Sequence, residues 1–69
     1  MDSEFIRVLN LDPSHRYELL RRESEQRRGR DTDLFHYREF NEQGEEIGIF
    51  TVEDSMSIYP PQRRTIRRL

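Results

Sequence analysis

Apolar and polar residues alternate most clearly in the middle of the chain. Leu34–Phe40 is rich in aromatic residues and Ile47–Val52 in β-branched and aromatic residues, a composition typical of β-strands. Asn41-Glu-Gln-Gly44 lies between the two segments and is typical of a type I turn followed by a left-handed glycine. The pattern therefore predicts a β-hairpin over residues 33–53.

The register of this hairpin follows from counting outward from a pairing of Asn41 with Glu45. The count predicts four cross-strand pairs: Tyr37 with Ile49, Phe35 with Thr51, His36 with Phe50 and Leu34 with Val52. Apolar residues meet on both faces, and this favours the register over one shifted by a single residue. The more apolar face is expected to form the core, and it carries Phe35, Tyr37, Ile47 and Ile49.

The region before the hairpin allows two interpretations, which part at Asp12-Pro-Ser-His15. As a helix start, this segment supplies an N-cap and a first-turn proline, and good helix formers follow to residue 28. As a type I turn, it joins a strand at 5–11 to a strand at 16–23. A helical face would find only Leu20 as an apolar residue at the required spacing, so the pattern favours the strands.

The predicted fold is mainly β, a small antiparallel meander of three to four strands at about 5–11, 16–23, 33–41 and 46–53. Residues 24–32 are then a charged loop. Residues 1–59 form one small domain, and residues 60–69 form a flexible Arg-rich tail because Pro60-Pro61 ends regular pairing. The alternative is an α+β domain in which a helix at 13–28 packs on the 33–53 hairpin.

The chain is short for a domain that must cover its own sheet. It has 69 residues, of which 32% are hydrophobic, and it has no cysteine. A disulfide staple and a thiolate metal site are therefore excluded. A lone sheet must bury its apolar face against a second layer, and a second copy packed about 10 Å away supplies one. The sequence therefore predicts a homodimer.

Charge is segregated along the chain, although the net charge is only −2. Two basic segments, His15–Arg30 and Ser55–Leu69, flank an acidic segment at 31–54, and every basic residue is Arg. Such asymmetry is found in proteins that bind nucleic acid. The slightly negative net charge favours another interpretation, in which the basic segments neutralise the acidic one.

Candidate catalytic chemistry is limited to His36, Asp54 and Ser57, which would have to meet at the end of the hairpin. Nucleophile-elbow glycines, a Gly-rich phosphate loop and the ligand spacing of a calcium or zinc site are all missing from the sequence. We therefore expect no enzyme, no cofactor, no metal and no small-molecule substrate. With no signal peptide and no run of about 20 apolar residues, no membrane partner is expected either, and the expected location is cytoplasmic.

The function predicted from the sequence is that of a small accessory or regulatory protein acting by protein–protein interaction, with itself or with another protein. The alternative is a nucleic-acid-binding modulator that uses the Arg clusters at 27–30 and 63–68. The residues expected to contact a partner are Phe35, Tyr37, Ile47, Ile49, Arg27, Arg28, Arg30, Arg63, Arg64, Arg67 and Arg68.

Overall fold

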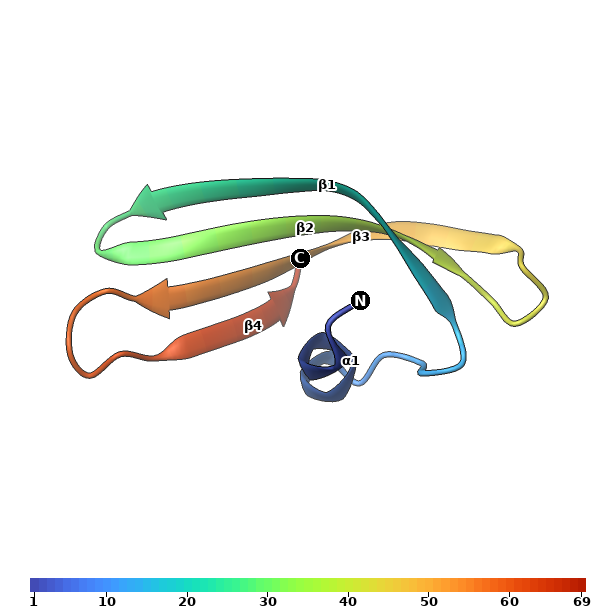
Figure 1. The fold of residues 1–69 in the computed structure, drawn as a ribbon, viewed down its shortest axis with the longest axis horizontal. Coiled ribbons are helices and arrows are strands. Elements are labelled where there is room, and N and C mark those ends of the chain that lie inside the picture. The colour runs from blue at the N-terminus through green and yellow to red at the C-terminus, as the bar shows by residue number, and fades with distance from the viewer.

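The computed structural model describes the backbone of residues 1–69 and every side chain except that of Arg27. Its elements are α1 (Ser3–Leu9), β1 (Arg16–Arg27), β2 (Arg30–Phe40), β3 (Glu46–Ser57) and β4 (Arg64–Arg68). The four strands form one antiparallel sheet in the order β1-β2-β3-β4, and α1 lies against one face of it (Figure 1). The predicted small antiparallel meander is confirmed, and the alternative helix at 13–28 is wrong because most of that segment is β1.

Helix α1 replaces the strand that the sequence predicted at 5–11, and that prediction is wrong. Asp2 is the N-cap, and its carboxylate accepts a hydrogen bond of 2.8 Å from the backbone N–H of Glu4. Asn10 ends the helix in the left-handed conformation with φ 53°. A helix of seven residues is too short to be stable alone, so its stability comes from packing on the sheet.

A tight turn at Asp12–His15 connects α1 to β1. The backbone N–H and the hydroxyl of Ser14 both donate to the Asp12 carboxylate, at 2.9 and 2.6 Å. These hydrogen bonds lower the pKa of Asp12. The turn interpretation of this segment was therefore right, although a helix rather than a strand precedes it.

The hairpin of β2 and β3 is present, but its register differs by one residue from the predicted one. Its turn is as expected, since the Asn41 N–H donates to the Glu45 carbonyl at 2.9 Å. A bulge follows, in which Phe40 pairs with Glu46 and Glu39 with Gly48, leaving Ile47 as the extra residue. The slip brings Tyr37 opposite Phe50 and Phe35 opposite Val52.

The shifted register changes which β3 residues enter the core. Phe50 and Val52 are buried, whereas Ile47 and Ile49, which the sequence analysis placed in the core, are 51% and 62% exposed. A one-residue slip moves every following side chain to the other face of the sheet. Only the β2 half of the predicted apolar face was therefore correct.

β1 and β2 are longer than predicted, and the expected charged loop at 24–32 does not exist. The two strands pair as far as Arg27 with Arg30, so that only Arg28 and Gly29 form the turn. Both have positive φ, 52° and 73°, as a two-residue type I′ turn requires. The charged residues at 24–27 thus form strand because they pair directly with residues 30–33 across the hairpin.

The basic segment that was expected to form a flexible tail instead contributes β4 to the sheet. Val52–Met56 of β3 pairs antiparallel with β4. Ile66 in this strand packs against the core. The part of the prediction that placed these residues outside the sheet is wrong.

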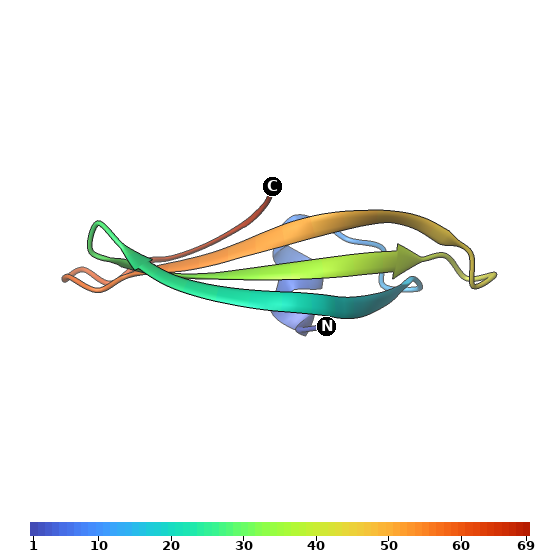
Figure 2. The same ribbon diagram turned by 90° about the horizontal axis from the view of Figure 1, so that it is seen from above.

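The hydrophobic core lies between α1 and the middle of the sheet. The fully or nearly buried apolar residues are Phe5, Leu11, Tyr37, Phe50 and Val52. The Phe5 ring lies 5.3 Å from that of Phe35, measured between centroids. The molecule extends over 44 × 21 × 15 Å, so both ends of the sheet project well beyond the helix (Figure 2). In the described part of the chain, no second layer covers the opposite face of the sheet (Figure 2).

Candidate interaction surfaces

Of the residues that were expected to contact a partner, the two aromatic residues lie in the core and not on the surface. Tyr37 is only 4% exposed, and Phe35 packs under α1 beside Phe5. These two aromatic residues belong to the internal core and are not available for docking. Helix α1 also supplies the layer that a second copy was expected to supply, which removes the physical reason given for the homodimer.

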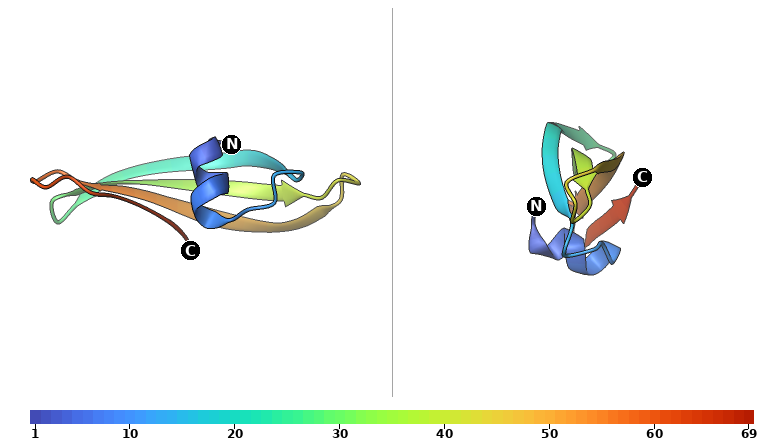
Figure 3. Two further views of the ribbon diagram at one scale, coloured as in Figure 1. Left: turned by 90° about the horizontal axis from the view of Figure 1, so that it is seen from below. Right: turned by 90° about the vertical axis from the view of Figure 1, so that its right-hand side faces the viewer.

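Ile47 and Ile49 lie where β3 has no neighbouring strand on its outer side. β4 pairs only with the other half of β3, and the last contact is the hydrogen bond of 2.9 Å from the Leu69 N–H to the Thr51 carbonyl. Beyond this point β3 still pairs with β2 but has no strand on its outer side as it runs toward the turn at 41–45 (Figure 3). We call residues 46–50 of β3 the open edge.

The backbone of the open edge is oriented for pairing. In an antiparallel ladder, alternate residues direct both their N–H and C=O to the same side. The Thr51 carbonyl faces β4, so Ile49, two residues earlier, directs its N–H and C=O outward as well. No residue of β4 reaches Ile49. The open edge therefore presents an unpaired donor and an unpaired acceptor next to an exposed isoleucine.

Acidic side chains border the open edge at the adjoining turn. The Asn41 side-chain carbonyl accepts hydrogen bonds from the N–H groups of Gln43 and Glu45, at 3.0 and 2.9 Å, which fixes the turn. Glu42 and Glu45 are exposed there. The local charge is negative, which favours positively charged groups on anything that binds beside it.

The first Arg cluster and the start of the second come together at the opposite end of the sheet. The Ile58 N–H donates to the Gly29 carbonyl at 2.9 Å, so the connection between β3 and β4 lies against the turn between β1 and β2. Arg28 and Arg63 are exposed at this end. The side chain of Arg27 lies outside the described part of the structure.

All three Arg side chains of β4 have partners within the molecule. Arg64 donates two hydrogen bonds to Asp54, at 3.0 and 2.8 Å, and Arg67 donates two to Glu53, at 2.8 and 3.3 Å. These carboxylates raise the pKa of both guanidinium groups. The guanidinium of Arg68 lies 4.4 Å from the centre of the Phe50 ring. Basic β4 thus neutralises acidic β3, as the internal interpretation of the charge pattern predicted.

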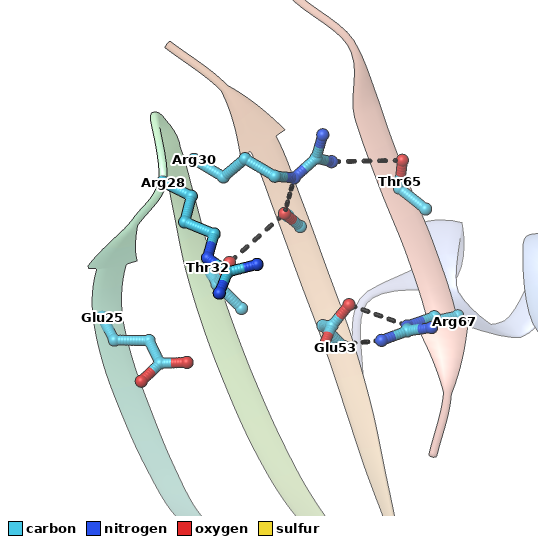
Figure 4. Close-up of a pocket in the computed structure, with 8 residues that line it drawn as sticks. Glu25, Arg28, Arg30, Thr32, Glu53, Thr65 and Arg67 are labelled. Atoms are coloured by element: carbon cyan, nitrogen blue, oxygen red, sulfur yellow. Dashed lines mark hydrogen bonds and ion pairs between the residues drawn. The ribbon is translucent and has the colours of Figure 1, made fainter.

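A polar hollow of about 480 Å³ opens on the sheet face opposite α1 (Figure 4). Its lining comes from all four strands and the β1–β2 turn: Glu25, Arg28, Arg30, Thr32, Glu53, Ser55, Thr65 and Arg67. The hydroxyl of Ser55, which is 3% exposed, accepts a hydrogen bond of 2.8 Å from Arg30 Nε and lies 3.2 Å from the Thr32 hydroxyl. Arg30 Nη2 also donates to the Thr65 hydroxyl at 3.4 Å.

Sequence analysis missed the three hydroxyl residues of this hollow. The predicted strands ended before Ser55 and began after Thr32, and β4 was not predicted at all. The available signal was the spacing of Glu53 and Ser55 with Thr65 and Arg67, which places two polar pairs on one face of an antiparallel ladder.

The candidate catalytic residues do not meet. His36 Nδ1 lies 2.8 Å from the Thr51 hydroxyl and Nε2 lies 3.3 Å from the Glu23 carboxylate. Asp54 is on the other face of the sheet, bound to Arg64, and the Ser57 hydroxyl donates to the Tyr59 carbonyl. Among the described residues, no three His, Asp or Glu side chains gather as a group that could hold a metal ion.

His15 ties the α1–β1 connection to the sheet through an ion pair that depends on pH. Its Nδ1 lies 2.7 Å from the Glu39 carboxylate, and its Nε2 lies 3.3 Å from that of Asp12. The hydrogen bond to Glu39, helped by the charge of Asp12, raises the pKa of His15 above its ordinary 6.5. Because this pKa is raised in the folded state, protonated His15 stabilises the fold below pH 6.5. This stabilisation is lost as the pH rises through the folded-state pKa.

The stability contributed by His15 is therefore expected to fall as the pH rises above about 6.5. Urea unfolding at a series of pH values measures the slope, which His15→Gln should reduce. In a Glu39→Gln background the same histidine substitution should change the slope much less. An unchanged slope in the His15→Gln variant would show that this pair does not contribute.

Comparison with protein-family models, with curated proteins and with solved structures finds no significant match for this chain. The one helix in the described chain, α1, has neither the length nor the apolar character to cross a membrane.

Proposed function

We propose that this protein is a small accessory or regulatory protein that acts by binding another protein, and that the partner adds a short β-strand to the open edge. The observation that carries the proposal is Ile49, which is 62% exposed and directs its N–H and C=O away from the sheet. In strand addition, backbone hydrogen bonds supply the affinity and alternate side chains supply the specificity.

The two long edges of the sheet differ in how well they are guarded against pairing. Natural sheets protect edges with charged side chains and bulges. The outer edge of β1 has both: it is rich in Arg and Glu, and its register shifts between Leu19 and Arg21. The open edge instead carries two isoleucines, and the bulge at Ile47 leaves room for a strand of only a few residues. The open edge is therefore the better site for an added strand.

The chemistry of the open edge selects the kind of strand that fits. Ile47 and Ile49 favour apolar or β-branched side chains on the added strand, because cross-strand pairs of this type are stabilising. The exposed carboxylates of Glu42 and Glu45 favour Lys or Arg where that strand passes the turn. We propose a partner segment that is extended, apolar and flanked by a basic residue.

Site-specific photo-crosslinking tests this proposal. A photoreactive amino acid in place of Ile49 should capture a discrete partner in cells that produce the protein. The same amino acid in place of Val8, which is 44% exposed on the outer side of α1, should not. Equal capture at both positions, or none at Ile49, would contradict the proposal.

A proline variant tests the strand-addition geometry itself. Ile49→Pro removes an outward-facing N–H and leaves the hydrogen bonds between β2 and β3, so it should abolish capture by a crosslinker at Ile47 while the far-ultraviolet circular dichroism is retained. Leu20→Lys at the opposite edge is the matched control and should leave capture unchanged. Capture that survives Ile49→Pro would exclude strand addition.

Self-association at the same edge remains a prediction, and light scattering over a concentration series measures it. An antiparallel second copy that set Ile49 opposite its own counterpart would place this turn beside residues 53–57 of that copy, where β4 already occupies the edge. This steric overlap favours a different protein as the partner.

The alternative, a nucleic-acid-binding modulator, has less support. Arg28 and Arg63 do lie at the same end of the sheet, but Arg64 and Arg67 are each bound to a carboxylate. Phosphate contacts release counterions, so binding to mixed oligonucleotides should weaken steeply with salt. Retention of an oligonucleotide at about 50 mM salt, with loss in an Arg28→Asn, Arg63→Gln variant, would favour this alternative.

A further inference from the structure

We propose that the polar hollow binds an oxyanion, the phosphate or carboxylate group of a small ligand, through Arg30 and Arg28. The site lies at the end of the sheet remote from the open edge and is independent of the proposed strand addition. Its central feature is the Arg30 guanidinium, which hydroxyl groups orient and which pairs with no carboxylate among the described side chains.

Arg30 is held in place before any ligand arrives. Its Nε donates to the buried Ser55 hydroxyl at 2.8 Å, and its Nη2 lies 3.4 Å from the Thr65 hydroxyl. Among the described side chains, no carboxylate is within ion-pair distance of the Arg30 guanidinium. Hydroxyl partners fix the orientation without removing the charge, and a side chain ordered in advance loses less entropy on binding.

The remaining donors of Arg30 suit an oxyanion. A guanidinium carries five N–H groups in a planar fork that matches the spacing of carboxylate and phosphate oxygens. Two of the five point toward Ser55 and Thr65, which leaves the Nη1 side of the fork available. The hollow is open to solvent on this side, and Figure 4 shows the guanidinium above the strands that line it.

Arg28 adds a second positive charge from the rim. It lies in the β1–β2 turn with φ 52°, and its side chain reaches back over β2 toward Thr32 (Figure 4). The guanidinium groups of Arg28, in the turn, and of Arg30, the first residue of β2, thus line the same hollow.

The net charge of the side chains that line the hollow is positive, although two of them are acidic. Glu53 is bound by Arg67, with both carboxylate oxygens accepting hydrogen bonds. Glu25 lies on the opposite rim, on β1, and its charge opposes an anion there. An anion therefore binds best at the Arg28–Arg30 side. A volume of about 480 Å³ is sufficient for a small ligand that carries such a group.

Titration of ¹⁵N-labelled protein with inorganic phosphate, at an ionic strength kept constant with sodium chloride, tests the proposal. We expect saturable shifts of the amides of residues 28–32, Ser55 and Thr65 and of the Arg30 Nε–H, with a dissociation constant on the order of 1 mM. A parallel titration with acetate distinguishes the ligands. Saturation by phosphate alone assigns a phosphate site, and saturation by acetate, alone or with phosphate, assigns a site that accepts carboxylates.

Three variants locate the site. Arg30→Gln should weaken binding at least about tenfold, and Arg28→Asn, which tolerates the left-handed turn, should weaken it several-fold. Arg21→Gln is the matched control, because Arg21 is an exposed β1 arginine on the same face, and it should bind as the unmodified protein does. Shifts that stay linear with both anions, or equal affinity in Arg30→Gln and Arg21→Gln, would overturn the proposal. The amide spectrum away from the hollow confirms that each variant is folded.

Discussion

Replacement of Phe5 by alanine is expected to lower the free energy of unfolding by about 3 to 5 kcal/mol. The Phe5 side chain is 2% exposed and is the buried residue of α1 in the hydrophobic core. Its removal leaves a cavity between the helix and the rings of Phe35 and Tyr37. A helix this short has no stability of its own, so the lost contact is not compensated within α1.

Urea denaturation measures this effect, with Val8→Ala as the control from the exposed side of the same helix. The control should change the free energy of unfolding by less than about 0.5 kcal/mol. A domain of this size has a total stability of roughly 3 to 10 kcal/mol, so Phe5→Ala approaches complete unfolding. Phe5→Leu keeps the measurement possible in that case and should cost about 1 to 2 kcal/mol. Equal effects of Phe5→Ala and Val8→Ala would show that α1 is not the cover of the sheet.

Replacement of Gly29 by alanine is expected to cost about 1 to 2 kcal/mol. Gly29 has φ 73°, a conformation that side chains with a Cβ adopt at a cost. A Cβ at this position would also lie 2.6 Å from Cε2 of the Tyr59 ring, so the ring would have to move. The substitution should therefore loosen the contact between the β1–β2 turn and the β3–β4 connection.

A double-mutant cycle with Tyr59→Ala separates the two causes. Removal of the ring should relieve the steric part of the Gly29→Ala cost and leave the conformational part. Gly48→Ala is the control, since no atom lies within 4 Å of its Cβ position and its φ is ordinary. That variant should be neutral or slightly more stable. A full cost for Gly29→Ala that Tyr59→Ala leaves unchanged would assign the whole effect to the backbone.

Local signals predicted the sheet but not its full extent. The hairpin turn at Asn41–Gly44 and the turn at Asp12–His15 were recognised from residues whose conformational preferences are strong. The charged stretch at 24–32 and the Arg-rich segment at 64–68 have low strand propensity, which predicts a loop and a tail. Each pairs because a complementary strand lies beside it, and this information is not local.

The errors at the core and at the candidate sites have two physical origins. A single bulge at Ile47 exchanged Ile49 for Phe50 as a core residue, and no residue in the turn indicates that bulge. In the structure Asp2 and Asn10 cap α1, but the strand interpretation of residues 5–11 took no account of these capping residues. The helix has only seven residues, with an arginine inside its apolar run, so its helical hydrophobic periodicity is too weak to outweigh the strand interpretation. The polar hollow requires four strands in register, so it was beyond prediction once β4 was missed.

The placement of α1 has a consequence for how the protein forms during synthesis. Each strand can pair with the strand made just before it, so the meander grows by successive local hairpins. Phe5 leaves the ribosome first, yet Phe50 and Val52, which complete its binding surface, are translated near the end. The growing sheet therefore keeps its apolar side uncovered until β3 is complete, and chaperones have their main opportunity to act in that interval.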